Sequence, residues 1–175
     1  MKSKSKLYIF DIILIILLII VDQATKYAAI NLLKNQQAYS LISGVLELNY
    51  LENYGAAFGM LQNQKIFFIF IALIFLAVII FIIIKAPDDK KYTKLHILLV
   101  MIGAGAVGNL IDRIRFNYVV DFIYFKLINF PIFNFADICV TVATFILIVL
   151  ILFYYKEHDF YFLSFKNEKF RELHK

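Results

Sequence analysis

The sequence is short of charge, cysteine and histidine, and each shortage excludes a class of protein. Charged residues make up 18% of the 175 residues and hydrophobic residues 62%, which is unlike a soluble globular domain. The single cysteine, Cys139, cannot form a disulfide within the chain. The three histidines (His96, His158 and His174) share no helical spacing. We therefore expect an integral membrane protein with no metal or other cofactor.

Four long apolar segments are present, and a helix needs about 20 such residues to cross a bilayer. They cover residues 8–29, 66–84, 95–113 and 138–155. The first segment follows three lysines, as a cleavable signal peptide would, but no clean cleavage site of small residues follows it. We predict four transmembrane helices in one domain of residues 1–156, followed by a cytoplasmic basic and aromatic tail at 157–175.

Lysine and arginine are shared unequally between the regions outside these segments. Twelve of the 18 lie before the first segment, in the loop 85–94 and in the tail, and six lie in the regions 26–65 and 113–126. Because positive residues collect on the cytoplasmic side of a membrane, both termini are predicted to be cytoplasmic. The same bias accounts for the net charge of +5 without a nucleic-acid partner.

The region between the first two apolar segments has a different pattern. Residues 44–51 partly alternate between two faces, which is typical of short strands. "NYGAAFG" (Asn53 to Gly59) follows as a turn of small residues, where a ligand or another chain can approach the backbone closely and where Gly55 and Gly59 allow motion. We expect a small extracytoplasmic β-sheet over about residues 38–62, resting on the membrane.

Polar residues near the ends of the spans are costly at membrane depth and therefore indicate functional sites. In "DQATK", Asp22 and Lys26 are four residues apart on one helical face, which favours a stabilising ion pair over direct chemistry. Asp11, by contrast, lies near the cytoplasmic end of the same segment, where we expect it to reach water and to have no role.

The stretch "GAGAVGNLIDR" combines small and polar residues. One helical stripe, directed at the bundle interior, carries Gly105, Asn109, Asp112 and Arg113. Ala104 and Gly108 form a pair of small residues suited to close helix packing. Arg113 has donors for a peptide carbonyl or a lipid phosphate, whereas simple anchoring at the membrane interface is the alternative.

Two aspartates lie in apolar surroundings between the last two segments. In "FNFAD", Asn134 is placed to cap the fourth helix, with Asp137 in the first turn, where the helix dipole favours a carboxylate. Asp121, in "VVDF", lies on an apolar extended segment, where desolvation favours the protonated acid. Two carboxyls of unequal proton affinity suit acid and base catalysis, as in aspartic proteases. A cap or an ion pair is the structural alternative for each.

The five motifs "DQATK", "NYGAAFG", "GAGAVGNLIDR", "VVDF" and "FNFAD", in this order between four spans, resemble those of the bacterial lipoprotein (type II) signal peptidases. The resemblance implies a four-helix aspartyl endopeptidase of the bacterial cytoplasmic membrane, with its active site at the extracytoplasmic surface. It implies cleavage of diacylglyceryl-modified prolipoproteins before the lipidated cysteine, with Asp121 and Asp137 as catalytic pair. Substrate-binding or supporting roles are expected for Asp22, Lys26, Asn53, Gly55, Asn109, Asp112, Arg113 and Asn134.

The chain departs from the family pattern at two places. Ala104, Gly105 and Ala106 stand where the family often has Gly-Gly-Ala, and the tail beyond Lys156 lies outside the pattern. The expected partners are lipidated prolipoproteins and membrane lipids, and we expect a monomer. A proton-coupled carrier would also use acids within the membrane, although such folds commonly have repeats and midplane sites. An assembly subunit would need only the helix-packing glycines.

Overall fold

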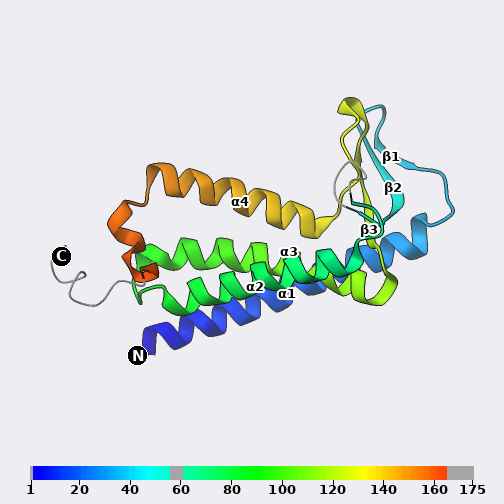
Figure 1. Cartoon of the computed structure of the whole chain (residues 1–175). Coiled ribbons are helices and arrows are strands. Elements are labelled where there is room, and N and C mark those ends of the chain that lie inside the picture. The colour runs from blue at the N-terminus through cyan, green and yellow to red at the C-terminus, as the bar shows by residue number, and fades with distance from the viewer. Residues whose placement is uncertain (1, 56–60, 165–175) are drawn as a thin grey trace.

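The computed structural model describes residues 2–55 and 61–164, which form a bundle of four long helices with a small sheet at one end (Figure 1). The helices are α1 (Lys2–Leu33), α2 (Lys65–Lys85), α3 (Thr93–Phe116) and α4 (Phe135–Phe153). Each contains a stretch long and apolar enough to cross a membrane. The predicted fold class, a multi-pass helical membrane protein with a small sheet, is confirmed.

Helix α3 is the inner helix of the bundle and packs against the other three. In its most apolar stretch 61% of the residues are buried inside the protein, compared with 11% in α1, 6% in α2 and 17% in α4. Because protein rather than lipid surrounds α3, this helix can carry polar side chains at a lower cost in free energy. Its glycines allow the close approach: a methyl group on Gly105 would lie 2.5 Å from the carbonyl oxygen of Ala136, and one on Gly108 would collide with Asp22.

The sheet consists of three antiparallel strands in the order β1, β2, β3. They are β1 (Tyr39–Ile42), β2 (Leu46–Asn53) and β3 (Val119–Phe125). The hairpin of β1 and β2 lies between the first two helices, as predicted, but the third strand comes from the segment between α3 and α4. Leu51 pairs with Asp121 and Asn53 with Val119, so the end of β2 lies beside the beginning of β3.

The sheet is held at the end of the bundle where α1 ends and α4 begins (Figure 1). Ala29 of α1 forms a buried apolar cluster with Val120 and Phe122 of β3, and Leu48 and Tyr50 of β2 pack against this cluster. The burial of apolar side chains on both sides of this contact fixes the sheet on α1.

The opposite end of the bundle is closed by two short 3-10 helices, η2 (Lys90–Tyr92) and η4 (Glu157–Leu163). The rings of Tyr92 and Tyr155 stack there, and the ammonium of Lys91 lies 2.6 Å from the carboxylate of Asp159. Residues that follow α4 therefore pack on the bundle end. Residues 165–175 of the predicted tail lie outside the described part of the chain.

The expectation that Asp11 reaches water is wrong. Its side chain is buried within the bundle, and its Oδ2 lies 2.7 Å from Nδ1 of His96 on α3. Among the described residues, neither Asp11 Oδ1 nor His96 Nε2 has a hydrogen-bond partner, although both atoms are buried. The contact joins α1 to α3, which the spacing of either residue along its own helix does not reveal.

Candidate active site

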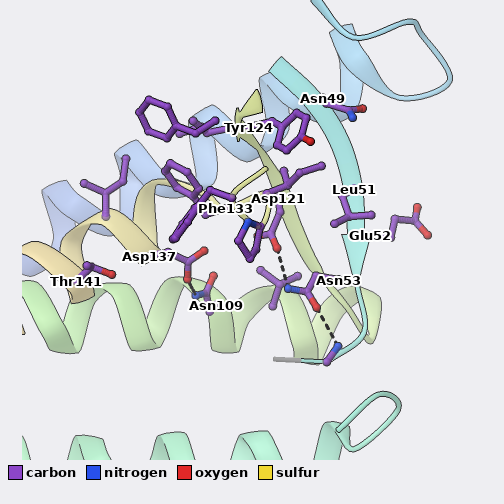
Figure 2. Close-up of a pocket in the computed structure, with 18 of the residues that line it drawn as sticks. Asn49, Leu51, Glu52, Asn53, Asn109, Asp121, Tyr124, Phe133, Asp137 and Thr141 are labelled. Atoms are coloured by element: carbon purple, nitrogen blue, oxygen red, sulfur yellow. Dashed lines mark hydrogen bonds between the residues drawn. The ribbon is translucent and has the colours of Figure 1, made fainter. Parts of the chain in front are cut away.

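A cavity of about 1330 Å³ lies where the sheet meets the beginning of α4. Its wall includes residues of β2, α3, β3 and α4, and both Asp121 and Asp137 line it (Figure 2). Apolar side chains such as Leu51, Ile123 and Val142 make up much of the remaining wall. The two aspartates therefore stand at a polar spot within a largely apolar cavity.

Asp121 lies on β3 with only 1% of its surface exposed. The side-chain amide of Asn53 donates to its Oδ2 at 2.8 Å, and that of Asn134 donates to its Oδ1 at 2.6 Å. Burial raises the pKa of Asp121 to about 7, and the nearby carboxylate of Asp137 acts in the same direction, whereas the two amide donors lower it. The expectation that desolvation favours protonated Asp121 agrees with this.

Asp137 lies in the first turn of α4, and its position is set by the helix cap predicted from the sequence. Asn134 Oδ1 accepts from the backbone N–H of Asp137 at 3.0 Å, and Asp137 Oδ2 accepts from the backbone N–H of Asn134 at 3.1 Å. This is a capping box, in which each side chain satisfies a free donor of the other residue. The remaining oxygen, Oδ1, accepts from the side-chain amide of Asn109 at 2.8 Å.

Two asparagines connect the aspartates. The Asn134 amide that donates to Asp121 also donates to Asn109 Oδ1, at 3.1 Å, and Asn109 in turn donates to Asp137. Asn134 is fully buried. The two carboxyls thus belong to one hydrogen-bonded group, and a change of charge on one is felt by the other.

Behind this group, Lys26 is buried and forms the centre of a second network. Its ammonium lies 2.9 Å from Asp22 Oδ2 and 3.0 Å from Asp112 Oδ2, and it donates to Asn109 Oδ1 at 2.9 Å. The predicted pair of Asp22 and Lys26 is confirmed, and Asp112 is a second carboxylate partner. Burial at 2% exposure requires such pairing, because an isolated ammonium there would be far too costly.

The two carboxylates of this network also hold backbone groups next to the cavity. Asp112 Oδ2 accepts from the N–H of Val120 at 3.1 Å, and Asp22 Oδ1 accepts from the N–H of Ala136 at 3.0 Å. Each of these two residues directly precedes one of the cavity aspartates in the chain. The network therefore fixes the backbone of β3 and of α4 directly before each cavity aspartate.

Arg113 of α3 reaches the turn that follows β2. Its guanidinium donates to the carbonyl oxygen of Gly55 at 3.2 Å and lies over the ring of Phe68, 4.7 Å from the centroid. Gly55 donates its N–H to Asn53 Oδ1 at 2.9 Å, and Asn53 donates to Asp121. Arg113 thus donates to a peptide carbonyl of its own chain, and its role in positioning a substrate stays a prediction. Residues 56–59 of the predicted turn, Gly59 included, lie outside the described residues.

All ten residues singled out from the sequence lie in these two connected networks or at their edge, and one further residue joins them. Gln23 belongs to the motif "DQATK", in which only Asp22 and Lys26 are predicted site residues. Its side-chain amide donates to Asp22 at 3.1 Å, to Asp112 at 3.1 Å and to the carbonyl of Gly108 at 3.3 Å. A polar residue next to a buried acid in an otherwise apolar helix was the signal for it.

Comparison with known proteins gives matches over most of the chain. The model of a family described as signal peptidase (SPase) II matches residues 14–153. A lipoprotein signal peptidase of Caldanaerobacter subterraneus is 45% identical over 143 residues, covering 81% of this chain and 95% of that protein. One of Clostridium tetani is 39% identical over 145 residues, covering 81% and 92%. A solved bacterial membrane enzyme structure is 32% identical, with a TM-score of 0.74 and coverage of 83% of this chain and 94% of that chain.

Proposed function

The chain belongs to the signal peptidase II family, the proteases that remove signal peptides from prolipoproteins, and we propose that it does so as an aspartic endopeptidase. Asp121 and Asp137 are the catalytic pair. One observation carries this proposal: the two carboxyls line a single cavity and are joined through the amides of Asn109 and Asn134. Because the chain belongs to this family, the alternative interpretations as a carrier or an assembly subunit no longer apply.

The reaction needs one proton shared by the pair. Asp121, whose pKa is raised to about 7, is the acid and hydrogen-bonds the oxygen of the scissile carbonyl. Asp137 is the base and takes a proton from the attacking water, whose oxygen bonds to the carbonyl carbon. The C–N bond then breaks as Asp137 passes this proton to the leaving nitrogen, which restores the Asp137 carboxylate. This division follows the aspartic protease pattern, in which two neighbouring carboxyls do not ionise together.

The substrate is a prolipoprotein that carries diacylglycerol on the cysteine after the cleaved bond. Two features support a lipid-bearing substrate. The cavity is largely apolar, and its wall residues Ile138 and Val142 are 37% and 43% exposed on α4, on the surface that would face lipid. A chain anchored by acyl groups would therefore enter sideways from the bilayer without crossing water.

The cavity lies at the extracytoplasmic surface of a bacterial cytoplasmic membrane, and both ends of the chain are cytoplasmic. The unequal distribution of lysine and arginine supports this orientation. In agreement with it, α1 begins and α4 ends at one end of the bundle, whereas the sheet lies at the other (Figure 1).

The experiment is a gel-shift assay in liposomes with a diacylglyceryl-modified prolipoprotein and its unmodified precursor. Wild type should cleave the lipidated substrate alone, and Asp121→Asn and Asp137→Asn should each lose cleavage while staying folded. Asp159→Asn, which removes a carboxylate at the far end of the bundle, is the matched control and should remain active. Cleavage by Asp121→Asn or by Asp137→Asn would exclude these two aspartates as the catalytic pair.

A further inference from the structure

One carboxylate on β2 gathers an unusual number of partners close to the cavity. The ammonium of Lys34 lies 2.8 Å from Glu52 Oε1, and the hydroxyl of Tyr50 donates to the same oxygen at 3.2 Å. The hydroxyl of Tyr54 donates to Glu52 Oε2 at 3.0 Å. Hydrogen bonding from Lys34, followed by that of the tyrosines, lowers the pKa of Glu52 to about 2. No motif in the sequence indicated this arrangement.

Tyr118, just before β3, completes the group. Its hydroxyl lies 3.5 Å from that of Tyr50, and its ring lies 5.3 Å from the ring of Tyr54. The five residues, here called the Glu52 cluster, are Lys34, Tyr50, Glu52, Tyr54 and Tyr118. They link the residue that follows α1 to the end of β2 and to the beginning of β3.

The Glu52 side chain points to the opposite side of β2 from the aspartates (Figure 2), although Glu52 and Tyr54 are also among the residues that line the cavity. Figure 2 shows Asn53 directed toward Asp121, whereas its neighbour Glu52 points to the other side of the strand. This follows from the alternation of side chains along a strand. Glu52 and Tyr54, the residues on either side of Asn53, are hydrogen-bonded to each other within the cluster. The backbone that carries Asn53 is therefore held from behind on both sides.

We propose that Glu52 is a positioning residue for Asp121, which it serves by holding the end of β2 so that Asn53 keeps its hydrogen bond to the Asp121 carboxylate. The significance of this role for catalysis rests on the proposed function, but the contact itself does not. Glu52 meets no reacting atom and acts through Asn53 alone.

If Glu52 served only to stabilise the fold, its loss would lower the free energy of unfolding and leave the titration of Asp121 unchanged. The positioning role predicts the reverse. The Lys34 side chain is 41% exposed and that of Glu52 is 27% exposed, and ion pairs near the surface add little to stability. Loss of Glu52 should thus leave the fold nearly as stable as before. Its effect should instead appear at Asp121, because a hydrogen bond to the charged form of an acid lowers the pKa of that acid.

The test is a direct titration of Asp121 in full-length protein labelled with ¹³C-aspartate in lipid nanodiscs, with the signal assigned by Asp121→Asn. Glu52→Ala should raise the pKa of Asp121 and lower kcat for a lipidated prolipoprotein on the order of tenfold, with KM little changed. The other charged groups near Asp121 are Asp137, Lys26 and Arg113. All three remain in this variant, so the loss of one of them does not account for a shift.

Two further variants make the result specific. Glu47 is a matched control because it also lies on β2 and pairs with an exposed lysine, Lys126, at 2.8 Å, yet it belongs to neither network. Glu47→Ala should leave the Asp121 titration unchanged. Glu52→Gln, which keeps one acceptor oxygen, should give a smaller shift than Glu52→Ala.

A double-variant cycle decides whether the effect passes through Asn53. If it does, Asn53→Ala combined with Glu52→Ala should shift the Asp121 titration no further than Asn53→Ala alone. An unmoved titration in Glu52→Ala, an equal shift in Glu47→Ala, or additive shifts in the double variant would each overturn the proposal. Failure of the proposed function is a separate result, since it would appear as cleavage by Asp121→Asn.

Discussion

The two ends of the bundle each bury an acid against a basic side chain, yet they differ in how completely the polar atoms are paired. At the sheet end, all four carboxylate oxygens of Asp22 and Asp112 accept hydrogen bonds around Lys26. At the other end, Asp11 and His96 meet through one contact of 2.7 Å, and each keeps a buried atom without a partner among the described residues.

The Lys26 network fixes the geometry of the cavity, whereas the contact at the other end only joins two helices. The Lys26 network reaches α1, α3, β3 and α4, so its removal disturbs four elements at the cavity. The contact of Asp11 with His96 reaches only α1 and α3. Buried polar groups specify a unique arrangement when every member is satisfied, and contribute far less when some members lack partners.

The largest effect should follow from Lys26→Met. This variant leaves Asp22 and Asp112 buried without their cation, and removal of one partner from a buried ion pair costs about 3–5 kcal/mol. Thermal unfolding in nanodiscs should report the loss, and cleavage should cease. Lys126→Met, which removes an exposed partner of Glu47, should change stability by less than about 1 kcal/mol. Similar losses of stability in the two variants would mean that the Lys26 network stabilises the protein no more than an exposed ion pair does.

The pH dependence of cleavage comes next. Because the pKa of Asp121 is raised to about 7, the catalytic proton is present below that pH and is lost as the pH rises through it. Well above pH 7, kcat/KM should therefore fall about tenfold per pH unit. His96→Asn at the opposite end should show the same descending limb as wild type. A rate that stays level between pH 7 and 9 would contradict the role of Asp121 as the acid.

A smaller effect is expected where α3 meets α4. Gly105→Ala places a methyl group 2.5 Å from the Ala136 carbonyl oxygen and 2.6 Å from Val140 Cγ2, which forces the helices apart just before Asp137. Overpacking of this kind costs about 1–3 kcal/mol and should reduce cleavage. Gly103→Ala is the matched control, since its methyl group would meet neighbours no closer than 3.9 Å. Equal activity of the two variants would show that this contact does not position the site.

The smallest effects on cleavage are expected at the far end. Asp11→Leu leaves His96 buried without its partner and should cost about 1–3 kcal/mol. Replacement of both residues, Asp11→Leu with His96→Phe, should restore most of that stability, because an apolar pair often replaces a buried polar pair without loss. Cleavage should be nearly unchanged in the double variant. An altered titration of Asp121 and Asp137 in this double variant would mean that the two ends of the bundle are coupled.

Local features of the chain were readable from the sequence. The apolar segments gave the four helices, the spacing of Asp22 and Lys26 gave their ion pair, and the order of Asn134 and Asp137 gave the capping box. Each of these depends on residues within a few positions of one another or on a continuous run. Helical periodicity and capping preferences are sufficient to predict such features.

Contacts between distant parts of the chain were not readable. His96 lies 85 positions after Asp11, so nothing near Asp11 signalled its burial. The pairing of β3 with β2 and the contact of Tyr118 with Tyr50 also join distant segments. Hydropathy places a helix in the membrane, but it does not determine which residue of another helix each side chain meets.

The backbone contacts of Asp22 and Asp112 have a dynamic consequence. The residue before Asp121 and the residue before Asp137 are tied to carboxylates that share one ammonium group. A displacement of β3 therefore pulls on the same lysine that restrains α4. Thermal fluctuations of the two aspartates should be correlated, so that the width of the gap between them varies less than the position of either one.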